Sequence, residues 1–300
     1  MAYRNIFISS PAHVSLKNSQ LIVKTDREYS FPLEDISTVL IETKQATITS
    51  RRLSRMGEAG VLVYLCDDKH LPCAVLTGYN NHSRKYKILQ SQLGVKLPLK
   101  KRLWQNIASQ KIKNQAQVLK ISGLNGEKEI SSLSLAVKPG DTDNTEATAA
   151  LKYFKYLFGP GFYRANEDIT NARLNYGYAI VRGLVCRNLA VYGFEPSIGI
   201  HHHNELNAFN LADDIIEPFR PLVDLLVKSM EDDDDKVQLT VRDKQRLYGL
   251  LSHDILIDGQ KQPLSYAVEK TVQSYQNSLL SGKNRLKLPE IIPLQIHSYE

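Results

Sequence analysis

Long apolar segments are missing from this sequence of 300 residues, and cysteine is scarce. No stretch approaches the roughly 18 to 20 apolar residues that cross a bilayer. The N-terminal residues MAYRNIFISS lack the basic start and apolar core of a secretory signal. The three cysteines, Cys66, Cys73 and Cys186, form no CxxC pair, which argues against a disulfide framework and against a structural zinc site. We therefore expect a cytoplasmic protein without a membrane segment.

Acidic residues are absent from one long stretch of the chain, between Lys69 and Gly126. The same stretch contains a series of basic residues: Lys69, Arg84, Lys85, Lys87, Lys96, Lys100, Lys101, Arg102, Lys111, Lys113 and Lys120. Acidic residues gather later, including the run from Glu231 to Asp235, and the formal net charge of the chain is +6. This asymmetry favours a surface that binds phosphate groups, although a solvated basic face explains it equally well.

Short segments rich in β-forming residues dominate residues 1–77. These segments are Asn5–Ser9, Val14–Leu16, Leu21–Lys24, Val39–Glu42, Val61–Cys66 and Pro72–Leu76. The second and third flank the polar residues 17–20 and therefore predict a hairpin, while one helix is expected between Thr49 and Gly60. A polar connector over residues 78–84 then marks the expected end of a small domain.

Helical patterns take over after this connector. The expected helices are Tyr86–Gly94, Leu99–Ser122, Thr145–Phe158, Ile169–Tyr192, Pro218–Ser229, Val241–Leu251 and Pro263–Leu280. Residues 123–144 are expected to form a loop around a short helix. The sequence therefore predicts an α+β protein, in which a small β-rich N-terminal domain (residues 1–77) precedes a larger, all-α C-terminal domain (residues 85–300).

A capped helix is predicted between Asp141 and Gly159. Asn144 or Thr145 can accept hydrogen bonds from its first free N–H groups, and Gly159 can end it. Glu146 then lies in the first turn, where the helix dipole favours a carboxylate. This position alone gives Glu146 a structural explanation.

The segment from Pro196 to Asp224 concentrates groups that can bind a metal ion. It contains three consecutive histidines at positions 201–203, whose side chains alternate in direction if the backbone is extended. Four charged residues follow at spacings that share one helix face: Asp214, Glu217, Arg220 and Asp224. One imidazole beside two carboxylates suits Mn²⁺, and oxygen ligands suit Mg²⁺. The alternative interpretation is a solvated acidic helix face beside a polar loop.

Three sequence blocks resemble the Cas1 family of CRISPR adaptation integrases, and most of all its members from type II systems. They are NTEATAALKYF at 144–154, NARLNYGYAIVRG at 171–183 and GFEPSIGIHHHNELNAFNLADDIIEPFRPLVD at 193–224. The last block is the most specific, because it joins a Gly-x-x-His loop to an Asp-x-x-Glu-Pro-Phe-Arg-Pro run. Together with the order of β-rich and helical parts, the resemblance covers nearly the whole chain.

The resemblance implies a metal site made by a Glu at the start of one helix, a His in a loop and an acidic residue on the next helix. By position these metal ligands and catalytic residues are Glu146, His202 and Glu217, with Asp214 nearby as a candidate second carboxylate. Arg220, one turn beyond Glu217, matches a basic position near the scissile phosphate and is also expected to be catalytic.

The histidine tract leaves the assignment of the imidazole ligand open to a small shift. His202 is favoured because it lies three residues after Gly199, as in the Gly-x-x-His pattern of the family. His201 and His203 are the alternatives.

For function, the resemblance implies that short DNA fragments (spacers) are inserted into a CRISPR array. A 3′-hydroxyl attacks a phosphodiester at the repeat boundary. The implied cofactor is Mg²⁺ or Mn²⁺, and the implied partners are a second copy of the chain, the Cas2 protein and, in type II systems, the Cas9 effector. Basic residues of the acid-free stretch would bind the backbone of double-stranded DNA from protospacer and repeat, with these candidates: Arg84, Lys85, Lys100, Lys101 and Arg102.

Two other functions fit the same residues. A stand-alone metal nuclease would use the same three ligands with water as the nucleophile. A non-catalytic DNA-binding module would keep the histidines and acidic residues for structure alone. Both catalytic interpretations require Glu146, His202 and Glu217 to converge on one site, although 71 residues separate the first from the last.

Overall fold

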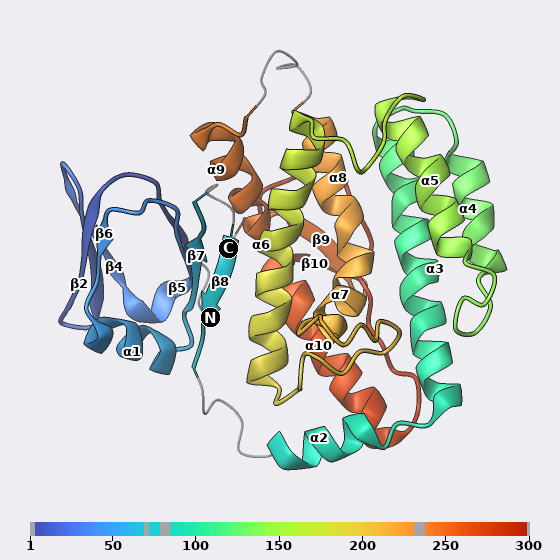
Figure 1. Cartoon of the computed structure of the whole chain (residues 1–300), viewed down its shortest axis with the longest axis horizontal. Helices are drawn as coiled ribbons and strands as arrows, with labels where there is room; N and C mark the ends of the chain where they lie inside the picture. Colours follow the sequence, from blue (N-terminus) through green and yellow to red (C-terminus); the bar gives the residue numbers. More distant parts are fainter. Residues whose placement is uncertain (1–3, 69–71, 79–84, 231–237, 299–300) are drawn as a thin grey trace.

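The computed structural model describes residues 4–68, 72–78, 85–230 and 238–298. A β-rich part, at the left of Figure 1, lies beside a larger helical part. Within the described ranges, no helix is long and apolar enough to cross a membrane. Most of the expected connector over residues 78–84 falls outside the described residues, and so do Arg84 and the acidic run at 231–235.

Two four-stranded sheets form the β-rich part. The first has the order β1 (Arg4–Ile8), β5 (Ile36–Ile41), β7 (Leu62–Cys66), β8 (Pro72–Leu76), and the second has the order β4 (Glu28–Pro32), β3 (Gln20–Lys24), β2 (Ala12–Lys17), β6 (Ala46–Thr47). β1, β5 and β7 are parallel, and β8 is antiparallel to β7. Apolar side chains of both sheets and of α1 (Ser50–Glu58) share one core, in which Val14, Val39 and Met56 are fully buried.

The expected hairpin over residues 14–24 is confirmed. β2 and β3 are antiparallel with Lys17 opposite Gln20, and the turn residues Asn18 and Ser19 have φ angles of 51° and 58°. Left-handed backbone at both positions is typical of two-residue turns that follow the twist of their strands. β4 was not expected from the sequence, because its first three residues are exposed and it therefore lacks the apolar alternation of a half-buried strand.

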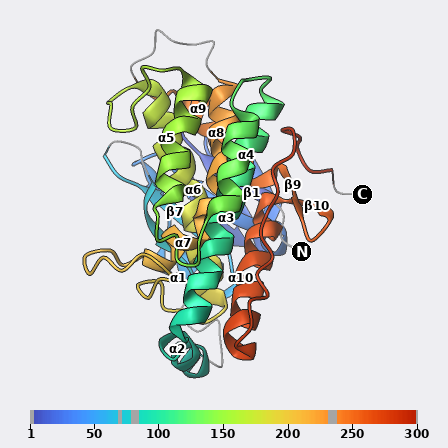
Figure 2. The same ribbon diagram turned by 90° about the vertical axis from the view of Figure 1, so that its right-hand side faces the viewer.

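The helical part is built around one long central helix, α6 (Figure 1). Its helices are α2 (Lys85–Leu93), α3 (Leu97–Ile121), α4 (Glu127–Ala136), α5 (Thr145–Phe158), α6 (Ile169–Val191), α7 (Asn210–Ile216), the 3₁₀ turn η2 (Glu217–Phe219), α8 (Arg220–Lys228), α9 (Val241–Gly249), the 3₁₀ turn η4 (Leu250–Ser252) and α10 (Leu264–Ser281). α6 packs against α7, α8, α9 and α10, while α3 packs against α4, α5 and α8 (Figure 2). Leu174, Ile180 and Leu184 of α6 are fully buried in this core.

The α+β class is confirmed, with one addition to the helical part. β9 (Asp254–Ile257) and β10 (Gln260–Pro263) pair as an antiparallel hairpin, where the sequence led us to expect helices alone. Asp258 and Gly259 form its turn with φ angles of 53° and 77°, and an Asp-Gly pair is a strong hairpin signal. The short helix expected between residues 123 and 144 is α4.

The β-rich part meets α6 through a close contact at Gly183. Tyr64 of β7 is fully buried there, and its hydroxyl donates a 2.8 Å hydrogen bond to the carbonyl of Ile180. A Cβ at position 183 would lie 2.1 Å from the Tyr64 ring. A buried ion pair between Glu42 and Lys244, 2.6 Å long, also joins the β-rich part to the helical part.

Substituting Gly183 tests this junction. In Gly183→Ala the added methyl group must displace Tyr64, and we expect the free energy of unfolding to fall by about 1–3 kcal/mol. Urea unfolding followed by circular dichroism measures it. Gly249→Ala is the matched control, because a Cβ there meets nothing within 4 Å and the change should stabilise the helix by about 0.5–1 kcal/mol. Equal stability of the two variants would contradict the proposed role of the Tyr64 contact.

Candidate active site

Asp141 caps α5 and thereby positions Glu146. Its two carboxylate oxygens accept hydrogen bonds from the backbone N–H groups of Thr145 (2.9 Å) and Glu146 (3.0 Å). The expectation that Asn144 or Thr145 would cap the helix is therefore wrong: Asn144 has left-handed backbone, with φ 54°, and makes no side-chain cap. Because Asp141 accepts hydrogen bonds from the first N–H groups of the helix, the Glu146 side chain is free to contact other residues.

Lys111 of α3 joins Glu146 to Glu217. Its ammonium pairs with Glu146 Oε1 and lies 2.5 Å from Glu217 Oε2, and only 11% of the Lys111 side chain is exposed. Burial opposes the charged form, but the carboxylates of Glu217 and Glu146 outweigh burial and raise the pKa of Lys111. The two predicted carboxylates, 71 residues apart in sequence, thus share one buried cation.

Arg220 lies on the other side of Glu217. Its Nε donates a 2.8 Å hydrogen bond to Glu217 Oε1, and its guanidinium lies 4.6 Å from the centre of the Tyr178 ring. Burial raises the pKa of Glu217, but Arg220 and Lys111 together lower it to about 2, so the carboxylate is ionised at neutral pH. Glu217 is held in this place by η2, which starts at this residue directly after α7.

Asp224 binds the hydroxyl of Tyr178, the residue whose ring lies against the Arg220 guanidinium. It is buried and accepts hydrogen bonds from the hydroxyls of Tyr178 and Tyr153, the latter 3.0 Å long. Burial raises the pKa of Asp224 to about 6. Asp224 was one of four charged residues expected on one helix face, and the structure turns it toward two tyrosines.

Asp214 organises the loop that carries His202. Its carboxylate accepts backbone hydrogen bonds from Ile200 (2.5 Å), His201 (3.0 Å) and His202 (3.1 Å). A Cβ at Gly199 would lie 2.2 Å from the carbonyl oxygen of His202, which explains the glycine of the Gly-x-x-His pattern. Asp214 is fully buried, and these bonds make it a support of the loop.

The same carboxylate fixes the His202 ring. His202 Nδ1 lies 2.7 Å from Asp214 Oδ1, and this hydrogen bond, the largest cause, raises the pKa of His202. A metal-binding histidine usually donates its other ring N–H to a carboxylate in this way, which fixes the tautomer. The arrangement leaves Nε2 of His202 as the nitrogen available to a ligand.

Trp104 of α3 packs against two of the three histidines. Its ring is stacked on that of His201, with centroids 4.2 Å apart and planes 3° apart, and meets His202 edge-on at 5.7 Å. Trp104 is buried, and its Nε1 has no hydrogen-bond partner within the described part of the chain. Ring stacking therefore determines where the indole lies. Neither Trp104 nor Lys111 was singled out from the sequence as a site residue.

The predicted ligands come together in part. Glu146 and Glu217 meet at Lys111, and His202 lies near enough to Glu217 for that charge to raise its pKa. Among the described residues, no group of three or more His, Cys, Asp and Glu side chains is spaced to hold a metal ion. The ammonium of Lys111 lies between the two carboxylates and itself balances their charge. The three-ligand metal site therefore stays a prediction. Its donors, two carboxylates and one imidazole, have the chemistry that Mn²⁺ or Mg²⁺ accepts.

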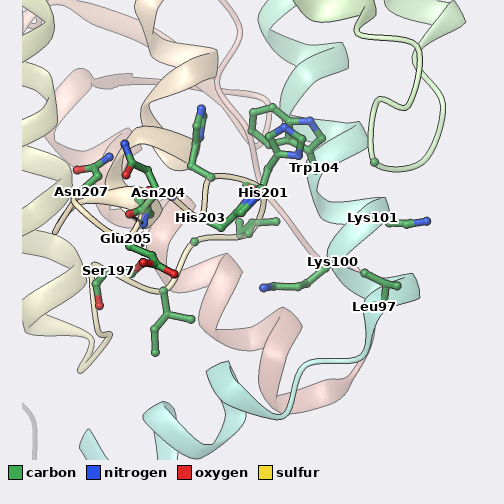
Figure 3. Close-up of a pocket in the computed structure, with 16 residues that line it drawn as sticks. Leu97, Lys100, Lys101, Trp104, Ser197, His201, His203, Asn204, Glu205 and Asn207 are labelled. Carbon is green, nitrogen blue, oxygen red and sulfur yellow. Dashed lines mark hydrogen bonds between the residues drawn. The ribbon is translucent and has the colours of Figure 1, made fainter.

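The predicted DNA-binding residues lie on different surfaces. Lys100 and Lys101 line a pocket of 510 Å³ that His202 also lines (Figure 3). Arg102 lines a separate hollow, together with Lys87, Lys96 and Lys283. Lys85 is exposed at the start of α2, and Arg84 lies outside the described residues.

Comparisons with known proteins find relatives of this sequence and of this fold. The family model for CRISPR associated protein Cas1 matches residues 6–236. The chain is 42% identical, over 305 residues, to the CRISPR-associated endonuclease Cas1 of Neisseria meningitidis serogroup C (strain 8013), and the match covers 100% of both chains.

Two solved structures share the fold at lower identity. One is a casposase bound to an integration product, with a TM-score of 0.78 and 17% identity over 94% of this chain and 92% of that chain. The other is a Cas6-RT-Cas1–Cas2 complex, with a TM-score of 0.71 and 20% identity over 94% of this chain and 35% of that chain. At such identities the likeness supports the β-then-α fold alone.

Removing Lys111 tests whether it neutralises the two carboxylates. In Lys111→Met the buried Glu217 and the partly buried Glu146 lose their shared cation, and we expect the free energy of unfolding at pH 7 to fall by about 3–5 kcal/mol. Glu217 keeps Arg220 but loses Lys111, so its pKa should be higher than in the wild type. In the wild type the lowered pKa of Glu217 makes stability fall as the pH falls, and the variant should lose less stability over the same range.

Urea unfolding in chelator at pH 7 and near pH 4 measures this difference. The difference in free energy of unfolding between Lys111→Met and wild type should be smaller at the lower pH. Lys113→Met, exposed on the same helix, is the control and should change stability by no more than about 0.5 kcal/mol. If the difference in free energy of unfolding is small, or does not change with pH, Lys111 does not neutralise Glu146 and Glu217.

Proposed function

The chain belongs to the family of CRISPR-associated protein Cas1, and from this premise we propose that it is a metal-dependent DNA integrase and endonuclease of CRISPR adaptation. Its substrates are the double-stranded DNA of a protospacer and of a CRISPR repeat. The relative from Neisseria meningitidis, which matches it over its full length, is named an endonuclease. Transfer of a strand and hydrolysis of a strand differ only in whether a DNA 3′-hydroxyl or water attacks the phosphodiester.

One observation carries this proposal. Glu146 and Glu217 reach the same buried cation from α5 and η2, next to a loop on which Asp214 leaves Nε2 of His202 available. Glu146, Glu217 and His202 would hold Mg²⁺ or Mn²⁺. The ion supplies stabilisation of the negative charge on the phosphate and lowers the pKa of the attacking hydroxyl.

The other residues of the site have roles that follow from their contacts. Arg220, oriented by Glu217 and by the Tyr178 ring, would neutralise charge that develops on the phosphate oxygens. Lys111 keeps Glu146 and Glu217 close together while no metal ion is bound. Lys100 and Lys101, beside His202, would bind the DNA backbone.

In the integration reaction the incoming 3′-oxygen forms a bond to phosphorus. The bond from phosphorus to the 3′-oxygen of the outgoing strand breaks and its bond to the 5′-oxygen stays, so one phosphodiester replaces another and no net water is consumed. The attacking hydroxyl loses its proton, and the leaving oxygen gains one. Hydrolysis by the same residues would consume one water molecule for each bond broken.

We also propose that the protein acts as a homodimer with the Cas2 protein, and in type II systems with the Cas9 effector. A complex that contains Cas1 and Cas2 is among the proteins that share this fold. Two active sites at a fixed spacing would allow both ends of a fragment to be joined, because positioning of the reactants can supply about 7–11 kcal/mol toward the barrier.

The test combines purified chain, Cas2 and Mn²⁺ or Mg²⁺ with a short duplex and a repeat-containing plasmid. Joined product should form with 3′-hydroxyl ends and not with dideoxy or 3′-phosphate ends. His202→Ala and Glu217→Gln should abolish joining, and Asp214→Asn should lower it by about 10–100-fold, the usual effect of losing a support of a metal ligand. Glu167→Gln, a change at an exposed carboxylate, should leave it unaltered. Plasmid nicking with no fragment attached would reject the integrase and favour the stand-alone nuclease.

A further inference from the structure

The buried Asn114 of α3 lies one helical turn beyond Lys111 and has no part in the proposed chemistry. Its side chain is 2% exposed, and residues three apart lie on one helix face. A buried amide costs free energy unless its donors and its acceptor are paired. The groups that Asn114 binds therefore show what it holds in place.

Every hydrogen-bonding position of this amide is occupied. Nδ2 donates to the carbonyl oxygens of Pro218 (2.7 Å) and Pro289 (3.0 Å). Oδ1 accepts from Nε2 of Gln110 (3.0 Å) and from the backbone N–H of Ile291 (3.4 Å). A side-chain amide can donate two hydrogen bonds and accept two. Asn114 thus joins α3 to two segments that lie far apart in the sequence.

The first segment is η2, where proline interrupts the ladder of helical hydrogen bonds between α7 and α8. Pro221 has no N–H, so the carbonyl of Glu217 cannot receive the bond that would continue an α-helix. The N–H of Arg220 donates to this carbonyl in the tighter 3₁₀ pattern. The predicted metal ligand therefore lies at a break in the helix, and the hydrogen bond from Asn114 to the carbonyl of Pro218 fixes this turn from outside.

The second segment, residues 289–291, is held from two sides. Its first and third residues are buried and bind Asn114. Between them, Glu290 exchanges backbone hydrogen bonds of 2.8 and 3.0 Å with Leu256 of β9. The segment therefore lies between α3 and β9. Its displacement would remove two of the four hydrogen bonds that orient the Asn114 side chain.

We propose that Asn114 is a positioning residue for Glu217 and that, through Asn114, residues 289–291 form part of the support of the active site. Lys111 and Asn114 hold η2 at two points, the first at the Glu217 carboxylate and the second at the adjoining backbone. The orientation of the η2 backbone decides where this carboxylate points, so the second contact keeps it directed toward Glu146. The inference rests on the proposed function, in which Glu217 binds the metal ion.

Asn114→Leu tests the proposal, because leucine has the same branching and no hydrogen-bonding group. In chelator, hydrogen exchange should become about 5- to 150-fold faster at 217–222 and 289–291 together, the range expected when buried groups lose a partner. Mass spectrometry measures it. The matched control is Asn188→Leu, at an asparagine that is 1% exposed and donates to the carbonyl of Leu184 within α6. The control should leave exchange in both segments unaltered. Unaltered exchange at 217–222 in Asn114→Leu would overturn the proposal.

The affinity for Mn²⁺ separates positioning from a general loss of stability. Titration calorimetry should show that Asn114→Leu binds Mn²⁺ about 10- to 100-fold more weakly, the usual effect of removing a support of a metal ligand. Asn188→Leu also loses a buried hydrogen bond but should bind Mn²⁺ like the wild type. Equal weakening in both variants, or an unaltered affinity in Asn114→Leu despite faster exchange, would show that Asn114 supports the fold and not Glu217.

Ile291→Ala tests the contribution of the C-terminal segment and leaves Asn114 itself in place. The Ile291 side chain is 2% exposed, so its truncation loosens the packing of residues 289–291. Exchange at 217–222 should become faster and the affinity for Mn²⁺ should fall, each by less than in Asn114→Leu. A wild-type rate of exchange at 217–222 would exclude the segment from the support of the site.

These outcomes are separable from a failure of the proposed function. If the wild type binds no Mn²⁺ or joins no DNA, the metal-site or integrase proposal is wrong, and hydrogen exchange alone decides whether Asn114 and residues 289–291 hold the turn at Glu217. If joining occurs, and Asn114→Leu joins DNA and exchanges hydrogen like the wild type, the positioning proposal alone is wrong.

Discussion

The ion pairs of Lys111 with Glu146 and Glu217 are the interaction on which the site depends. Glu217 is buried and Glu146 is partly buried, so their carboxylates would repel each other strongly in a medium of low polarity. Lys111 offsets this repulsion, because its ammonium contacts both. Lys111 reaches this position because α3 packs against both α5 and α8 in the helical part.

The three aspartates around the site bind different groups of the protein, although nothing in the sequence distinguishes them. Asp141 caps a helix, Asp214 holds a loop and an imidazole, and Asp224 accepts hydrogen bonds from two tyrosines. All three satisfy groups of the protein itself. Among the described residues, the carboxylates of Glu146 and Glu217 pair with the cationic side chains of Lys111 and Arg220, and they are therefore the carboxylates that a metal ion could bind after displacing the ammonium.

Much of the fold and part of the site could be predicted from the sequence. Local signals were sufficient for the β2–β3 hairpin, where a polar turn separates apolar strands, and for the long helices, whose apolar periodicity is sustained. The Asp258–Gly259 turn carried a local signal of the same kind that was overlooked. The candidate ligands Glu146, His202 and Glu217 came from motif resemblance, and their joint metal site remains a prediction.

Lys111 and Trp104 could not be found in this way. Lys111 reaches Glu146 across 35 residues, and Trp104 of α3 meets His201 of the 197–207 loop; neither spacing follows a local period. In sequence Lys111 is one of many lysines in an acid-free stretch and Trp104 is one apolar position on a helix. Only the packing of α3 against the 197–207 loop and α5 gives them their roles.

Anomalous diffraction from crystals of the protein soaked in Mn²⁺ tests the central claim most directly. The account predicts one strong manganese peak in contact with the carboxylates of Glu146 and Glu217 and with Nε2 of His202, and it predicts that the Lys111 ammonium moves away from between the two carboxylates. Manganese bound elsewhere, with Lys111 still bridging Glu146 and Glu217, would contradict it.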